Sequence, residues 1–243
     1  MRRTIAAVLT VLALAGAARA ADPERRVSLI IGNAAYQKIS ALSNPAHDAV
    51  AIGGALQRAG FQLVGGKPLL DLDKPGMERA IREFGRLLEG GAVAFLYYSG
   101  HGMQIGDRNY MIPVEAAPNN AREADFELVA VDLAMKQIAA GGGRLSIVVL
   151  DACRNNPFAG QGARASGGGL AAMDAPAGSV IAYATSPGKT ASDGPAGGNS
   201  PYAKALARAL GKLGVGVLDV FNEVGGGGEP GLLASAAPLL DLG

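Results

Sequence analysis

Short runs of apolar residues alternate along the chain with longer segments that carry helix signals. Five of these runs have the length and composition of buried strands: residues 27–31, 61–64, 93–98, 145–150 and 179–183. Five segments between or after them show helical spacing or helix boundary residues: 44–59, 75–88, 131–138, 201–210 and 217–224. Continuous apolar strands that alternate with helices predict an α/β fold, in which a mostly parallel sheet has helices on both faces.

Punctuating residues mark several boundaries of these elements. Asn44 followed by Pro45 is typical of a helix N-cap with proline in the first turn, and Gly60 marks the helix end. The strand at 93–98 is expected to break at the sequence Ser-Gly-His-Gly, and a short edge strand is expected at 109–114. In parallel sheets, ligands bind beyond the carboxyl ends of the strands, which directs attention to the loops that follow the predicted strands.

Composition narrows the class of protein. A chain of 243 residues with 49% hydrophobic content suits one domain with a sizeable core and excludes a fully disordered chain. The formal net charge of +1 is too even for a nucleic-acid binder that neutralises phosphates. The 36 glycines are about twice the average share and favour long loops.

The first twenty residues have the organisation of a targeting segment. Two arginines follow the initiating methionine, residues 5–17 form an apolar run, and residues 18–20 (Ala-Arg-Ala) match a signal-peptidase site. The run is too short to span a bilayer as a permanent helix, and no later segment is long enough. We therefore expect a signal peptide at 1–20, cleavage near Ala20, and an exported protein that is periplasmic or secreted.

The single cysteine, Cys153, cannot form a disulfide within the chain. In an exported protein such a residue is an intermolecular bridge, a reactive thiol, or a buried cysteine that behaves as a small hydrophobe. Cys153 lies three residues after one predicted strand, and His101 lies three residues after another. Strand ends on one sheet edge can bring them together, and a neighbouring imidazole stabilises a thiolate or takes up its proton. The spacing alone supports two interpretations equally: a catalytic Cys–His site, or purely structural roles for Cys153 and His101.

Other kinds of site have weaker support. One cysteine and two histidines make no ligand cluster at a recognised spacing, so no metal site is expected. No serine lies in a G-x-S-x-G elbow, and neither phosphate-binding glycine motif is present. The second histidine, His47, lies in the first turn of a predicted helix, where a solvated polar residue is ordinary.

Two motifs carry a resemblance to a known family. Residues 97–102 (Tyr-Tyr-Ser-Gly-His-Gly) and 151–158 (Asp-Ala-Cys-Arg-Asn-Asn-Pro-Phe) resemble the histidine and cysteine motifs of the caspase-like peptidases, in particular the bacterial metacaspases, or orthocaspases. The resemblance extends over residues 26–224 and implies a caspase-like three-layer sandwich. The Gly-rich segment 225–243 departs from the family pattern and is expected to be a divergent tail.

The resemblance implies catalytic roles at the matching positions. Cys153 resembles the nucleophile of the family, and His101 resembles its general acid/base. The backbone N–H groups of Gly102 and Cys153 would then form the oxyanion hole, where negative charge develops on the scissile carbonyl. Arg154 and Arg164, in the loop after the cysteine, are sites at which an enzyme specific for basic residues would cleave its own chain.

The resemblance also implies an acidic S1 pocket, formed here by Asp48, Ser99 and Asp151, that accepts Arg or Lys. Each residue has a structural alternative. Asp48 suits the first turn of a helix because of the helix dipole, Asp151 suits a strand end that bonds loop N–H groups, and Ser99 suits a turn. Asp125 and Asp193 are further acidic loop residues that either assist this pocket or are solvated.

The implied function is that of an exported cysteine endopeptidase, which hydrolyses peptide bonds after Arg or Lys through an acyl-enzyme. Its expected partner is a protein or peptide substrate with a basic P1 residue, and neither nucleic acid nor a membrane span is expected. The chemistry requires no cofactor, although the resemblance leaves Ca²⁺ activation open. Two alternatives remain: a non-catalytic caspase-fold module that binds peptides, and a thiol amidase or acyltransferase of other specificity. The sequence indicates no oligomeric state.

Overall fold

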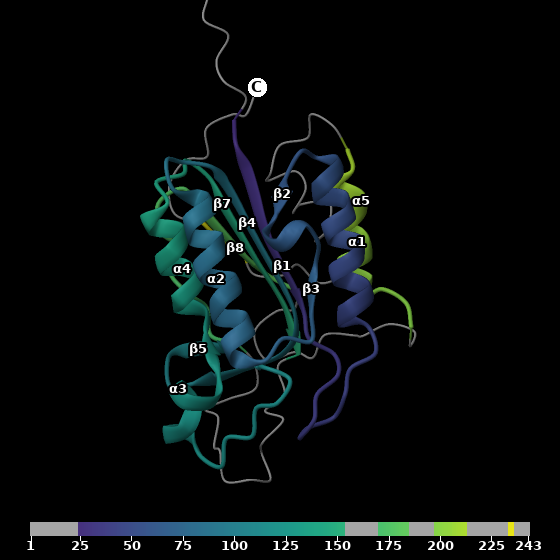
Figure 1. Ribbon diagram of the computed structural model, residues 1–243, viewed down its shortest axis with the longest axis vertical. Coiled ribbons are helices and arrows are strands. Elements are labelled where there is room, and N and C mark those ends of the chain that lie inside the picture. Colours follow the sequence, from purple (N-terminus) through teal and green to yellow (C-terminus); the bar gives the residue numbers. More distant parts are fainter. Residues whose placement is uncertain (1–23, 154–169, 185–196, 213–232, 236–243) are drawn as a thin grey trace, which may run out of the picture.

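The structure is a computed structural model that describes four parts of the chain: residues 24–153, 170–184, 197–212 and 233–235. The elements form three layers, with a sheet between two pairs of helices (Figure 1). Helices α2 (Lys74–Leu88) and α4 (Val131–Ala140) cover one face, and α1 (Pro45–Arg58) and α5 (Pro201–Leu210) cover the other. The predicted α/β architecture is confirmed.

Nine strands pair within the described residues: β1 (Arg26–Gly32), β2 (Gln62–Leu63), β3 (Leu69–Leu70), β4 (Val93–Ile105), β5 (Arg108–Met111), β6 (Val129–Ala130), β7 (Ser146–Cys153), β8 (Ser179–Tyr183) and β9 (Leu233–Ser235). The order along the sheet is β2-β1-β4-β7-β8-β9, and β3 also pairs with β1. Pairing is parallel from β2 to β8 and antiparallel between β8 and β9. Strands β5 and β6 form an antiparallel extension of β4.

Both faces of the central strands are buried. Along β4, Phe95 and Tyr97 belong to the core beneath α1 and α5, whereas Leu96 and Tyr98 belong to the core beneath α2 and α4. Burial on two faces explains why these strands appear in the sequence as continuous apolar runs rather than as alternating patterns. The central strands β4 and β7 are therefore held rigidly from both sides.

The helix boundaries agree closely with the sequence signals, with one difference in how a cap works. Each of α1, α2 and α5 carries a proline in its first turn, as the Asn44-Pro45 signal predicts for α1. Asn44 occupies the N-cap position, but its side chain makes no capping hydrogen bond because its backbone is already helical. In α2 and α5 the caps are the side chains of Asp73 and Ser200, which accept from Gly76 N and Ala203 N at 2.7 and 3.0 Å.

The predicted strand break after residue 98 is wrong. Strand β4 continues through the Ser-Gly-His-Gly sequence to Ile105, because neighbouring strands pair with its backbone over these residues. It pairs with β7 as far as His101 and with β5 from Gly102 onward. The predicted edge strand at 109–114 is the shorter β5, and the strand predicted at 61–64 is reduced to the two residues of β2.

Several predicted features lie outside the described residues. These are the targeting segment 1–20, the loop that contains Arg154 and Arg164, Asp193, the helix at 217–224 and most of the tail 225–243. In the part of the chain that the structure describes, no helix is both long and apolar enough to cross a membrane.

Candidate active site

The two central strands bring His101 and Cys153 to paired positions. The parallel register of β4 and β7 aligns Ser99 with Asp151, Gly100 with Ala152 and His101 with Cys153. Neighbouring strands lie about 4.8 Å apart, so the two chain positions are adjacent across the sheet. Both positions lie at the carboxyl ends of the parallel strands, although within the strands and not in the loops that the sequence predicted. For Cys153 the description covers the backbone only.

The imidazole of His101 is held by the segment between β1 and α1. Its Nε2 lies 2.9 Å from the carbonyl oxygen of Ser40, and its ring centroid lies 4.6 Å from that of Tyr36. A carbonyl oxygen can only accept a hydrogen bond, so this contact requires the proton on Nε2. In the neutral ring, Nδ1 is then the nitrogen that can take up a proton.

The backbone of His101 is held by two tyrosine hydroxyls. His101 N donates to Tyr36 Oη at 2.7 Å, and Tyr98 Oη donates to the carbonyl oxygen of His101 at 2.6 Å. A Cβ atom at Gly100 would lie 2.6 Å from the first hydroxyl and 2.8 Å from the second. A side chain at position 100 is therefore incompatible with this arrangement. At Gly102 a Cβ atom would lie 2.9 Å from the Cβ of Ala152 in β7.

A buried acidic cluster lies beside these positions, between the sheet and the first turns of α1 and α5. Asp48 and Asp151 are 1% and 7% exposed, and Ser200 joins them. Ser200 N donates to Asp48 Oδ1 at 2.8 Å, and Ser200 Oγ donates to Asp151 Oδ2 at 3.1 Å. Asn199 Nδ2 also donates to Asp48 Oδ1, at 3.0 Å. Ser99, which is 3% exposed, is the register partner of Asp151. The structure thus brings Asp48, Ser99 and Asp151 together.

Burial shifts the pKa of Asp48 in this cluster and of Tyr97 beside it. It raises the pKa of Asp48, while the hydrogen bonds from Asn199 and Ser200 oppose that shift. Burial and the nearby charges of Asp151 and Asp48 raise the pKa of Tyr97 well above its usual value. The phenol therefore stays protonated and donates to Asp151 Oδ2 at 2.8 Å. Buried hydrogen-bond donors thus surround the two carboxylates.

Comparison with known proteins agrees with these motifs. A family model described as a caspase domain matches residues 25–226. The chain belongs to the caspase-domain family of cysteine peptidases. Its three layers are accordingly those of the caspase-like sandwich.

Two curated proteins are similar to part of this chain in sequence. Mucosa-associated lymphoid tissue lymphoma translocation protein 1 of Homo sapiens and its homolog of Mus musculus are each 35% identical to the chain over 129 residues. The match covers 53% of this chain and 15% of each relative, so the chain spans only a small part of their length. That this chain belongs to the bacterial metacaspases, or orthocaspases, stays a prediction.

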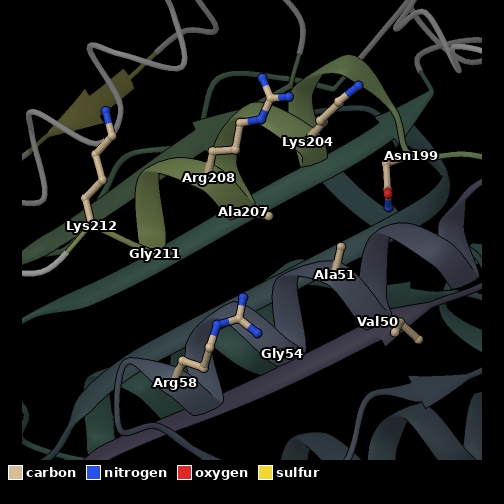
Figure 2. A pocket seen from close by; sticks show the side chains of 10 residues that line it. All are labelled: Val50, Ala51, Gly54, Arg58, Asn199, Lys204, Ala207, Arg208, Gly211 and Lys212. Carbon is tan, nitrogen blue, oxygen red and sulfur yellow. The ribbon is translucent and has the colours of Figure 1, made fainter.

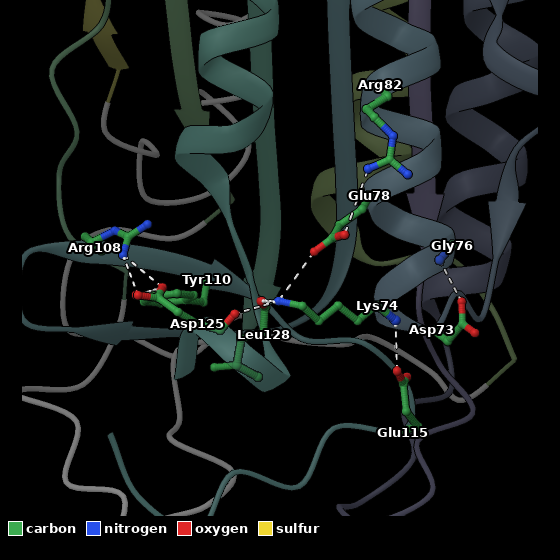
Figure 3. Close-up of polar contacts among 10 residues, drawn as sticks. All are labelled: Asp73, Lys74, Gly76, Glu78, Arg82, Arg108, Tyr110, Glu115, Asp125 and Leu128. Carbon is green, nitrogen blue, oxygen red and sulfur yellow. Dashed lines mark hydrogen bonds and ion pairs between the residues drawn. The ribbon is translucent and has the colours of Figure 1, made fainter. Parts of the chain in front are cut away.

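Asp125, which the sequence offered as a further acidic residue for the S1 pocket, lies in a different part of the structure. Asp125 lies on α3 (Ala124–Glu127), where it pairs with Arg108 at 2.9 Å and accepts from Tyr110 Oη at 2.9 Å (Figure 3). Lys74 Nζ donates to the carbonyl oxygens of Asp125 and Leu128 and ties this segment to α2. Asp125 therefore stabilises the β5–α3 region and lies outside the acidic cluster. Among the described residues, no three His, Cys, Asp or Glu side chains gather as a metal site.

Sequence reasoning missed the residues that hold this arrangement together. Ser40 acts through its backbone carbonyl, which no side-chain pattern reveals. Tyr36 resembles an ordinary core tyrosine in the sequence, and Tyr97, although part of the histidine motif, received no role of its own. Ser200 could have been found, because a serine directly before Pro201 is a typical N-cap signal.

Proposed function

We propose that this caspase domain is a cysteine endopeptidase that cleaves after Arg or Lys, with Cys153 as nucleophile and His101 as general acid/base. The observation that carries the proposal is the register pairing of His101 with Cys153 beside the buried pair Asp48 and Asp151. Cysteine chemistry at this position also agrees with the family match, because a purely peptide-binding caspase fold needs neither residue.

The mechanism follows from the tautomer of His101. With its Nε2 proton directed to Ser40, the imidazole takes the thiol proton on Nδ1. The thiolate of Cys153 attacks the scissile carbonyl, and the C–N bond breaks as the imidazolium returns the proton to the leaving amine. Water, deprotonated by the same imidazole, then hydrolyses the thioester and restores the thiol. The backbone N–H groups of Gly102 and Cys153 are the proposed donors to the oxyanion.

The proposed specificity follows from the acidic cluster. A guanidinium or ammonium group beside Asp48 and Asp151 compensates their negative charge, whereas a substrate aspartate adds a third carboxylate to a buried site. Ser99 provides an uncharged hydroxyl at the same place. The expected substrate is therefore a polypeptide with Arg or Lys at P1.

The proposed site of action is outside the cytoplasm. The basic start, the apolar run at 5–17 and the Ala-Arg-Ala sequence at 18–20 support export through a cleaved signal peptide. Stimulation by calcium is tested by running the peptide assay with and without Ca²⁺.

The proposal is tested with fluorogenic peptides that end in Arg, Lys or Asp, with and without Ca²⁺. We expect the wild-type chain to hydrolyse the Arg and Lys peptides and the Cys153→Ala variant to hydrolyse none. Hydrolysis of the Asp peptide alone would refute the acidic S1 pocket. Hydrolysis of small amides in place of peptides would favour a thiol amidase, and complete inactivity under all conditions would favour the peptide-binding module.

A further inference from the structure

A groove with a volume of about 710 Å³ runs between α1 and α5 (Figure 2). Its lining combines small side chains with long cationic ones. The small residues that the argument uses are Ala51, Gly54 and Ala207. Four cationic residues line the groove, and the argument uses three of them, Arg58, Lys204 and Arg208. Arg58 extends from α1, and the other two cations extend from α5, so both walls carry positive charge (Figure 2).

The positive charge of the groove is not neutralised by its own helices. Helix α5 contains no acidic residue, and the one acidic residue of α1 is the buried Asp48. Within the described parts of the chain, no ion pair engages Arg58, Lys204 or Arg208. Among the described lining residues, cations stand on two sides of the groove and no carboxylate lies between them, so this surface attracts an anionic ligand.

We infer that this groove binds an acidic, extended segment of a polypeptide substrate. Lys204 and Arg208 are one helical turn apart, which places them about 6 Å from each other along α5. Alternate residues of an extended peptide recur about every 6.8 Å on one side, so Asp or Glu at alternate positions matches the two cations. The small residues of the lining leave room for a peptide backbone. A flat anionic surface, such as a membrane, has no segment that fills the space between the two helices, which an extended peptide does.

The groove is continuous with the acidic cluster through one residue. Asn199 lines the groove, and its Nδ2 donates to Asp48 Oδ1 at 3.0 Å. A basic site and an acidic site thus lie next to each other on the same layer. This inference rests on the proposed function: one polypeptide places its basic P1 residue beside Asp48 and an acidic segment in the groove. Opposite charges at the two sites fix the direction in which the substrate lies.

Binding to the groove is measured without catalysis. The full-length Cys153→Ala chain is titrated into a fluorescein-labelled peptide with glutamate at alternate positions and no basic residue, and anisotropy is followed. We expect saturable binding that weakens with added salt, and a loss of about tenfold in affinity on adding Lys204→Glu and Arg208→Glu. The matched control carries the same charge change at the exposed Lys67 and Lys136, away from the groove, and binds as the parent does.

Equal affinity of the two double variants would overturn the inference, as would binding to vesicles of anionic lipid with none to the peptide. Catalysis provides an independent readout. The Lys204→Glu, Arg208→Glu variant should cleave a short Arg peptide at the wild-type kcat/KM but lose about tenfold on a peptide with an added acidic segment. Equal losses on both peptides would contradict a separate site. Absence of all turnover would refute the proposed peptidase while anisotropy still reports on the groove.

Discussion

His101 is oriented by the chain segment between β1 and α1. The Ser40 carbonyl fixes the proton on Nε2, and the Tyr36 ring and hydroxyl contact the imidazole and the backbone N–H. The contact with the Ser40 carbonyl holds the neutral imidazole in one tautomer, which is what the proposed role of His101 as general acid/base requires. At the scale of single residues, the absence of a side chain at Gly100 is what allows the tyrosine hydroxyls to reach this backbone.

The substitution Gly100→Ala tests this packing. The new Cβ would lie 2.6 Å from Tyr36 Oη, so the tyrosine or the strand must shift and His101 moves with it. We expect kcat/KM for an Arg peptide to fall by roughly 100-fold and the free energy of unfolding to fall by about 1–3 kcal/mol. Peptide hydrolysis and urea unfolding measure the two effects.

Gly54→Ala is the matched control. Its Cβ meets only Arg58 Nη1, at 3.5 Å, in the middle of α1. This variant should keep the wild-type kcat/KM for a short Arg peptide, which does not reach the groove that Gly54 lines. It should also gain about 0.5–1 kcal/mol in stability, because alanine is the better helix former. Wild-type activity in Gly100→Ala would contradict the role given to the tyrosine pair.

The burial of Asp48 makes the stability of the fold depend on pH. Burial raises its folded pKa above the usual value, so the protonated form favours folding. That contribution is full below the unfolded pKa and is lost as pH rises through the folded pKa. Above the folded pKa the ionised carboxylate therefore opposes folding.

The variant Asp48→Asn is expected to be more stable than wild type near about pH 7, and this gain should disappear near about pH 4. Its amide oxygen still accepts from Ser200 N, so the hydrogen bond at Oδ1 is retained. Hydrolysis of Arg peptides should fall by roughly 100-fold at neutral pH, because one of the two carboxylates has lost its charge. Urea unfolding at the two pH values, with hydrolysis assays, checks both statements. A less stable variant at neutral pH would show that the ionised carboxylate supports the fold.

At the scale of elements, the start of α5 joins the acidic cluster to the helix layer. Ser200 caps the helix through Ala203 N and at the same time donates to Asp151 Oδ2. Removing one hydroxyl therefore removes both a helix cap and a hydrogen bond to a buried carboxylate.

Ser200→Ala should lower the free energy of unfolding by about 1–2 kcal/mol, with an unchanged dependence on urea concentration. Ser200→Thr keeps a hydroxyl at the cap and should lose much less. The midpoints of the two urea transitions give the comparison, and an unfolding midpoint of Ser200→Ala equal to that of wild type would rule out this double role.

The elements differ in how well the sequence predicted them. The central strands and the four long helices were predicted within a few residues, because burial on both faces of the sheet leaves continuous apolar runs. The extension of β4 through residues 99–102 was not predicted, since serine, histidine and glycine have little strand propensity and the pairing with β7 and β5 is not local.

The site was predictable only in part for the same reason. The positions of His101 and Cys153 near the strand ends follow from the sequence, and the family motifs indicate Asp48, Ser99 and Asp151. The supporting contacts from Ser40, Asn199 and Ser200 depend on backbone groups and on segments far apart in the chain. Such contacts appear only when the chain is folded.

At the scale of the whole molecule, the layer formed by α1 and α5 separates an acidic cluster, on its side toward the sheet, from a basic groove between the helices. Helices α1 and α5 bury the carboxylates of Asp48 and Asp151 against the sheet and present a basic groove between them (Figures 1 and 2). The other layer, with α2 and α4, contributes the larger apolar core. The sheet between them keeps the His101 and Cys153 positions in register.

The most direct test of the central claim is covalent labelling of the full chain with a peptidyl chloromethyl ketone that ends in Arg. The Cys153 thiolate displaces chloride from this probe, and mass spectrometry locates the labelled residue. We expect the probe to form a thioether at Cys153, the matching Asp probe to leave the protein unlabelled, and His101→Ala to slow labelling strongly. Labelling elsewhere in the chain, or equal labelling by the Asp probe, would contradict a Cys–His peptidase with an acidic S1 pocket.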